Sequence, residues 1–258
     1  MNINFLRSFF VNFITLSFIF IIIIISSLSA LAQSKRGSPS AMPARGSSAV
    51  NYRILANYDY IMTSPSDLNT FSSGLSWTST NTPTKFDTMN GYSLGVGYLM
   101  GAGFLGLEYG YGIQELPSTF IPPSSTVQYS LDYQTVYLLY DWVFNSSSKQ
   151  SFELGAGVGY ALKYQYHWLY KTGGTITEVI WQDNPIVFKV RAHYNYHFTN
   201  TFRLRLGATY ELASSSNLKA DSSNLGVVQG QTLRYSGGQN VKVDTSGLRL
   251  NAGLVLAF

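Results

Sequence analysis

Hydrophobic and polar residues alternate along most of the chain after residue 49. This period of two places successive side chains on opposite faces of an extended strand, and we find no comparable helical periodicity in the same region. The eight predicted strands are 51–61, 91–100, 104–113, 127–144, 152–166, 186–198, 202–212 and 248–258. We therefore predict an all-β fold.

The last of these strands shows the pattern most clearly. Its polar face carries Arg249, Asn251 and Gly253, and its other face is wholly apolar. The apolar face consists of Leu248, Leu250, Ala252, Leu254, Leu256 and Phe258. An apolar outward face with a mixed, polar inward face is typical of a strand whose outer side contacts lipid.

The segments between the strands alternate between short and long. The short connections are 101–103, 145–150 and 199–201, and the long ones are 63–90, 114–126, 167–185 and 213–240. Short turns at one end and long loops at the other are typical of a transmembrane antiparallel up-and-down β-barrel in the bacterial outer membrane, with both termini on the periplasmic side. A soluble barrel would instead be polar outside and apolar inside.

Composition agrees with a surface that contacts something other than water. Charged residues make up 12% of the chain, about half the usual share. The chain has 19 Tyr and 23 Gly but no Cys, which excludes disulfides.

The N-terminus has the pattern of a secretory signal peptide. Arg7 precedes an apolar run over 13–25, and the small residues Ala30 and Ala32 stand before Gln33 as a predicted cleavage site. An uncleaved membrane anchor is the alternative. The chain accordingly divides into a signal peptide (1–32), a basic, disordered periplasmic leader (33–48) and an outer-membrane β-barrel (49–258).

From residue 49 onward the chain resembles the small eight-stranded outer-membrane β-barrel proteins, the group of the OmpA transmembrane domain, OmpX and the opacity-type adhesins. Such barrels share a C-terminal assembly signal, and its places here are Asn251, Gly253, Leu256 and Phe258. The resemblance implies insertion by the barrel-assembly machinery into the outer membrane of a Gram-negative cell, in contact with membrane lipid and lipopolysaccharide. The signal describes insertion and leaves the activity open.

The inward faces of the predicted strands carry charged residues. The interior of an eight-stranded barrel is just wide enough for side chains to fill, and buried charges must be paired. We predict two layers of ion pairs: Arg53, Glu108, Glu153, Arg203 and Arg205 near the short turns, and Asp59, Lys189, Arg191, Glu211 and Arg249 near mid-height. Glu211 and Asp59 are both expected beside Arg249. The same alternation predicts that Lys163 and Asp132 face inward. A polar plug is favoured over an ion or solute path.

Aromatic residues at the strand ends predict girdles at the two membrane interfaces. The predicted outward set is Tyr52, Tyr92, Tyr111, Tyr133, Tyr164 and Tyr194, with Phe104, Phe144, Phe152, Phe198 and Phe202 beside the short turns. In the fourth strand the phase becomes unclear near Leu138 and Leu139, and a bulge there would explain it.

Candidate catalytic groups are few. His193 and His197 face inward, but four residues of strand separate them by about 13 Å, too far to share a metal. The chain has no His-x-Ser pair of the kind that outer-membrane lipid A deacylases use. No Ser-His-Asp, metal-binding or phosphate-loop motif stands out either. We expect no catalytic residue, cofactor or metal, and no nucleic-acid partner.

The long loops are the expected functional surface, because binding residues concentrate on loops held by a rigid scaffold. The third loop reads as a hairpin, 168–172 and 175–181 joined at Gly173 and Gly174, whose edge could pair with an extracellular ligand. The sequence thus favours a non-enzymatic protein that is envelope-structural or surface-binding in the manner of an adhesin. A narrow channel or small-solute carrier of the OmpW kind is the alternative, and a lipid-A-modifying enzyme comes third.

Overall fold

The computed structural model describes residues 51–63, 65–74, 85–117, 119–121, 125–144, 146–147, 149–221 and 227–258. They lie within one compact unit, Ser48–Phe258. The predicted signal peptide and leader lie outside the described residues. Within the described ranges, no helix is both long and apolar enough to cross a membrane.

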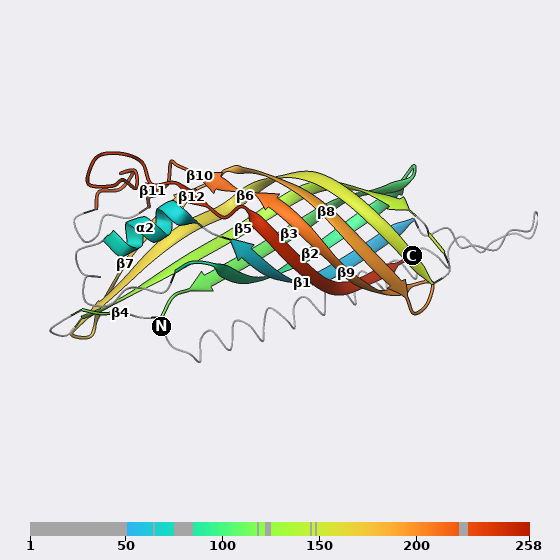
Figure 1. The fold of residues 1–258 in the computed structure, drawn as a ribbon, viewed down its shortest axis with the longest axis horizontal. Helices are drawn as coiled ribbons and strands as arrows, with labels where there is room; N and C mark the ends of the chain where they lie inside the picture. Colours follow the sequence, from blue (N-terminus) through green and yellow to red (C-terminus); the bar gives the residue numbers. More distant parts are fainter. Residues whose placement is uncertain are drawn as a thin grey trace, which may run out of the picture. The chain divides into compact units, whose positions relative to one another are not determined.

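Eight long antiparallel strands close into a barrel, as the alternation predicts (Figure 1). They are β1 (Tyr52–Thr63), β2 (Thr88–Met100), β3 (Gly103–Glu115), β5 (Ser125–Phe144), β6 (Gln150–Thr172), β8 (Ile186–His197), β9 (Phe202–Leu212) and β13 (Gly247–Ala257). Each pairs with the next one along the chain, and β13 pairs with β1 to close the barrel. The start of β1 and the end of β13 therefore meet at the end that carries the short turns.

The long connections contain short elements of their own at the opposite end of the barrel (Figure 1). These are α2 (Ser66–Gly74), β4 (Thr119–Ile121), β7 (Thr175–Asp183), β10 (Ser214–Ser215), β11 (Lys219–Ala220) and β12 (Val243–Asp244). The predicted hairpin is confirmed, since β7 folds back on β6 through Gly173 and Gly174. Both glycines have positive φ, 52° and 88°, which residues with a side chain rarely adopt.

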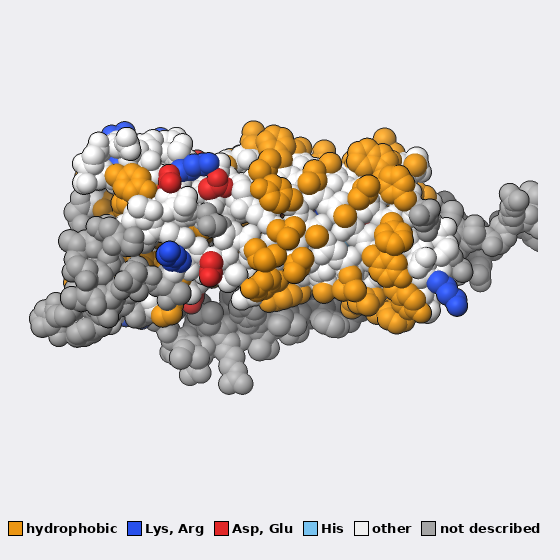
Figure 2. Space-filling model, in the orientation of Figure 1, with side chains coloured by type: hydrophobic (Ala, Val, Ile, Leu, Met, Phe, Trp, Pro, Cys, Tyr) orange, Lys and Arg blue, Asp and Glu red, His pale blue; other side chains and the backbone are white. Residues whose placement is uncertain are grey.

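An apolar band surrounds the part of the barrel nearer the short turns (Figure 2). Three strands carry outward aromatic residues eight positions apart: Tyr52 and Tyr60 on β1, Phe152 and Tyr160 on β6, and Phe202 and Tyr210 on β9. Eight residues span about 26 Å along a strand and, at the usual tilt, about 20 Å across a bilayer. Leucine and valine side chains fill the space between, such as Leu154 and Val158 on β6. The predicted aromatic girdles are present at both edges of this band.

Beyond the band, the polarity of the barrel reverses. On β5, Tyr129, Leu131 and Tyr133 face inward with no exposed surface, and the polar Gln128 and Ser130 face outward. The prediction that Tyr133 faces lipid was therefore wrong. This outer part encloses a hydrophobic core like that of a soluble barrel, so its apolar residues point inward.

The predicted bulge exists, but it lies on the neighbouring strand. Gln134 pairs with Lys163 and Thr135 with Ala161, so β6 contains one extra residue, Leu162. Past Leu162 the even-numbered side chains of β6 point inward, among them Tyr164, which was predicted to face outward. The inversion of polarity, not a bulge, explains the unclear phase of β5.

Three further side chains depart from the prediction. Lys163 and Asp132 were expected inside the barrel but lie on its outer face, where Lys163 Nζ contacts Asp132 Oδ2 at 3.1 Å. The bulge moves Lys163 outward, and the reversed polarity of β5 does the same for Asp132. Phe104 was assigned to a girdle but is buried inside, with the Arg53 guanidinium 4.2 Å from its ring centre.

Candidate functional site

The barrel interior collects most of the buried charge of the described chain. Because side chains alternate along each strand, every second residue enters the lumen. Five basic and five acidic side chains are buried there, namely Arg53, Lys189, Arg191, Arg205 and Arg249 with Asp59, Glu108, Asp141, Glu153 and Glu211. The formal charges of this set cancel, as a low-dielectric interior requires.

Asp141 is the centre of the largest ion-pair network. Arg191 holds both of its carboxylate oxygens, with Nε 2.7 Å from Oδ1 and Nη2 2.6 Å from Oδ2. Arg53 donates to Oδ2 as well, and Arg205 Nη2 lies 3.9 Å from the same oxygen. These three arginines come from β1, β8 and β9 and reach Asp141 on β5. One carboxylate thus links four strands across the lumen.

The network continues in both directions from Asp141. Toward the short turns, Arg53 Nη1 donates to Glu153 Oε2 at 2.8 Å and Arg205 donates to the same oxygen. Toward mid-height, Arg191 Nη1 donates to Glu108 Oε2 at 2.5 Å, and Lys189 donates to Oε1. Seven side chains therefore form one continuous network rather than a separate layer near the turns.

A second pair lies farther from the short turns. Arg249 donates to Glu211, as their adjacent strands suggest, and Tyr137 Oη donates to the same carboxylate at 2.5 Å. Lys189 Nζ lies 3.5 Å from the centre of the Tyr137 ring, which brings this pair close to the larger network.

Two predicted members of the ion-pair layers behave differently. Asp59 accepts a hydrogen bond from Asn251 and, within the described part of the chain, makes no ion pair with Arg249. Arg203 donates to the Asn200 carbonyl at 3.4 Å, and no described carboxylate lies within ion-pair distance of it.

Sequence reasoning missed Asp141, which has more ion-pair partners than any other described residue. The signal was present, because Tyr140 and Trp142 look lipid-facing and strict alternation then places Asp141 inside. The presumed bulge obscured it.

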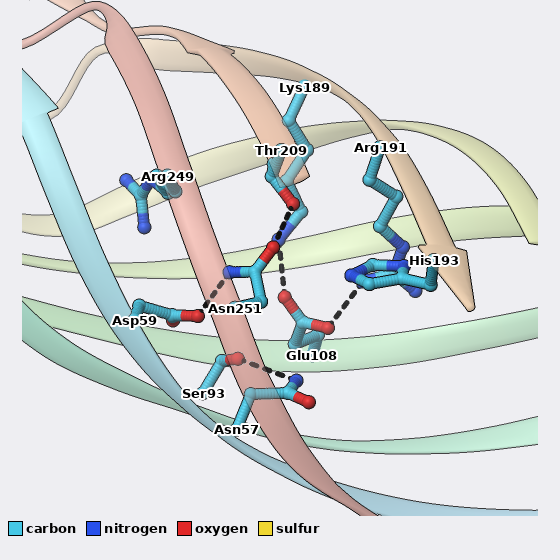
Figure 3. Close-up of a pocket in the computed structure, with 10 residues that line it drawn as sticks. All are labelled: Asn57, Asp59, Ser93, Glu108, Lys189, Arg191, His193, Thr209, Arg249 and Asn251. Atoms are coloured by element: carbon cyan, nitrogen blue, oxygen red, sulfur yellow. Dashed lines mark hydrogen bonds and ion pairs between the residues drawn. The ribbon is translucent and has the colours of Figure 1, made fainter. Parts of the chain in front are cut away.

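A small cavity lies at mid-height among these side chains (Figure 3). Its volume is about 10 Å³, room for about one water molecule. The lining residues are Asn57, Asp59, Ser93, Glu108, Lys189, Arg191, His193, Thr209, Arg249 and Asn251. All ten are polar or charged, and they come from six strands.

A hydrophobic core fills the part of the barrel between the charged side chains and the long loops. Tyr129, Tyr133, Tyr164 and Tyr166 are completely buried in it. At its outer end α2 inserts Leu68 and Phe71, and the Phe71 ring stacks on Trp168 with their centres 6.0 Å apart.

Hydrogen bonds fix α2 in this position. Ser72 Oγ lies 2.8 Å from Tyr166 Oη, and Tyr235 Oη donates to the Asp67 carbonyl at 2.8 Å. The helix is therefore held against the hydrophobic core at the outer end of the barrel.

His193 and His197 both lie on β8 and face the interior of the barrel. His193 lines the cavity and is 4% exposed, and His197 Nε2 lies 3.1 Å from Ser151 Oγ. Across the described ranges, no group of three metal-ligating side chains occurs. The arrangement is that of a packed interior.

The four residues of the predicted assembly signal lie along β13 and just beyond it. Asn251 faces inward against Asp59, and a side chain at Gly253 would collide with Asn57. The carbonyl of Phe258 accepts hydrogen bonds from the amides of Asn51 and Tyr52 at 2.6 and 3.0 Å, beside the closing seam. Their reading as an assembly signal stays a prediction.

Neither a family model nor a curated protein matches the sequence. Among solved structures, Neisserial surface protein A is similar at 14% identity with a TM-score of 0.44, over 80% of this chain and 97% of that one. The attachment invasion locus protein Ail of Yersinia pestis is similar at 8% identity with a TM-score of 0.40, over 81% and 99%. The outer membrane protein AlkL is similar at 13% identity with a TM-score of 0.43, over 86% and 97%.

These similarities concern the fold, which the strand pairing shows independently. The barrel closes with eight antiparallel strands, carries an apolar band outside and encloses paired charges. Only a closed barrel lets strands cross a bilayer with every backbone group hydrogen-bonded. The chain is thus a closed eight-stranded antiparallel β-barrel whose outer surface carries an apolar band.

Proposed function

We propose that the protein is a non-enzymatic, non-conducting outer-membrane barrel that supports the envelope and presents its long loops to ligands outside the cell. The observation that carries this proposal is the filled lumen. The ion-pair network around Asp141 occupies the part near the short turns, and the aromatic core occupies the outer part. Between them, the mid-lumen cavity of about 10 Å³ is too small for a solute.

The outer end of the barrel supports a role in surface contact. Beyond the apolar band, β6 and β7 form a hairpin in which Ile176 is 53% exposed. On the same hairpin, His167 Nδ1 lies 2.9 Å from Glu178 Oε1. Polar side chains near the band, such as the Lys163 and Asp132 pair, are suited to contact lipopolysaccharide. Ordered loops on a rigid barrel are a suitable platform for binding.

Planar-bilayer recording tests whether the lumen is closed. We expect the purified, refolded protein to produce no stable single-channel currents, because conduction would require both the ion-pair network and the aromatic core to open. A difference in gel migration between unboiled and boiled samples verifies that the protein is folded. Stable openings from such a sample would contradict the proposal and favour the narrow-channel alternative.

Mass spectrometry of lipid A tests whether the protein is an enzyme that modifies this lipid. We expect the same lipid A from cells with and without the protein.

We also propose an orientation and a route of assembly. The short-turn end, where β1 begins and β13 ends, faces the periplasm, and the loop end faces outward. Residues 1–32 are removed after Ala32, so that the mature chain begins at Gln33. The barrel-assembly machinery then reads Asn251, Gly253, Leu256 and Phe258.

Changing Phe258 to alanine tests the assembly signal. We expect a marked fall in the amount of folded protein in the outer membrane of expressing cells, because the signal loses its aromatic residue. The same variant, purified and refolded into detergent, is expected to fold nearly as well as the parent protein. Phe198→Ala is the matched control, since Phe198 is an exposed aromatic residue beside a short turn. Equal losses for both variants in cells would indicate a general effect of interfacial aromatics instead.

A further inference from the structure

Two oppositely charged side chains line the mid-lumen cavity without direct contact (Figure 3). Asp59 on β1 is 2% exposed, and Arg249 on β13 is 4% exposed. They are diagonal neighbours across the seam that closes the barrel, since Asp59 pairs with Asn251 and Arg249 with Ile61. Yet within the described ranges their side chains form no ion pair within 4 Å. Arg249 pairs instead with Glu211, and Asp59 accepts a hydrogen bond from Asn251. A guanidinium has five N–H donors and a carboxylate has about four lone-pair sites, so each side chain can still bind a third group in the cavity.

Several polar atoms around the cavity also lack a hydrogen-bond partner in the described structure. These are Arg249 Nε, a donor, Asn57 Oδ1, an acceptor, and His193 Nδ1, which serves as either according to its tautomer. All three side chains are more than nine-tenths buried. A buried polar atom without a partner is costly, so the cavity offers both donors and acceptors to a bound molecule.

The size and charge of the cavity restrict which molecule it can hold. A volume of about 10 Å³ holds about one water. The formal charges of the five basic and five acidic buried side chains of the lumen cancel, so an added ion would give this set a net formal charge in a low-dielectric interior. Water is neutral, donates to a carboxylate and accepts from a guanidinium.

We infer that the mid-lumen cavity is a binding site for one buried water molecule that bridges the Asp59 carboxylate and the Arg249 guanidinium. The ion pair between the first and last strands is then water-mediated. This bridge adds a side-chain link to the backbone hydrogen bonds of the closing seam. The site is independent of the proposed surface function, since it lies inside the barrel.

A high-resolution crystal structure tests the inference directly. Crystals of the detergent-solubilised protein are grown in rubidium bromide instead of sodium chloride. We expect one density peak in the cavity, within hydrogen-bond distance of Asp59 and Arg249, with no anomalous signal at the rubidium or bromine edge. An anomalous peak would show a bound cation or anion, and the lack of any density would show a dry cavity. Either result would overturn the inference.

A pair of serine variants adds a matched comparison. Ser93 and Ser151 both face the lumen, and each accepts a hydrogen bond from an asparagine amide, Asn57 Nδ2 at 3.1 Å and Asn195 Nδ2 at 3.4 Å. Only Ser93 lines the cavity. We expect Ser93→Val to fill the cavity and remove the density, and Ser151→Val to leave it in place. Density that persists unchanged in Ser93→Val would contradict the assignment. If Ser93→Val does not fold, the parent structure alone decides.

Discussion

Replacing Asp141 by asparagine is expected to lower the free energy of unfolding of the barrel by about 3–5 kcal/mol, the usual cost of removing one partner from a buried ion pair. The amide is nearly isosteric, so the change removes the charge and leaves the volume. Arg53, Arg191 and Arg205 then share one neutral oxygen in place of a carboxylate. Unfolding of the refolded barrel in urea, monitored by migration on a gel, measures the loss of stability.

Asp244→Asn is the control for this change. Asp244 Oδ2 lies 2.8 Å from Lys242 Nζ, but the two side chains are 33% and 50% exposed. An exposed pair contributes about 0–1 kcal/mol, so we expect little change. Similar losses in both variants would mean that Asp141 is not the centre of the interior network.

Replacing Trp168 by alanine is expected to cost about 3–5 kcal/mol, the usual range for truncating a buried large aromatic residue. Its ring contacts Phe71, Tyr166 and Trp181, with centres 6.0, 6.2 and 5.7 Å away. Phe71 belongs to α2, so loss of the Trp168 ring also removes part of the surface on which this helix packs. We expect lower stability to urea together with faster proteolysis at the ends of α2.

Trp142→Ala provides the same chemical change in a different environment. Trp142 lies on the outer face of β5 and is 45% exposed. Its loss leaves no internal cavity, so we expect a smaller fall in stability and no change in cleavage near α2. Greater sensitivity at Trp142 would contradict the view that the outer part of the barrel has a core of its own.

Much of the fold follows from local alternation. The eight strands, the short turns and the inward faces of β1, β8, β9 and β13 agree with the sequence pattern, because inside and outside differ in polarity over the whole membrane-spanning part. The proximity of Arg249 and Glu211 follows as well, since they lie on adjacent strands. These features can be predicted from the two-residue period of a strand and the order of the strands along the chain.

Tyr133 and Tyr164 show where local reasoning ends. Tyr133 and Tyr164 resemble lipid-facing residues, but the loops and α2 cover the outer part of the barrel and turn its interior into a hydrophobic core. One extra residue at Leu162 then reverses the facing of the rest of β6. Neither effect has a local signature, because both depend on what packs against the strand.

The sequence by itself determined a closed barrel with an apolar outside, a charged inside and long loops at one end. Only the tertiary structure decided which charges meet, because partners such as Arg53 and Asp141 lie 88 residues apart, on strands that are not neighbours in the barrel. It also decided that the lumen is filled at two levels, by ion pairs and by an aromatic core. Strand period specifies which side of the sheet a residue faces, but height and distance across the barrel depend on the register of all eight strands together.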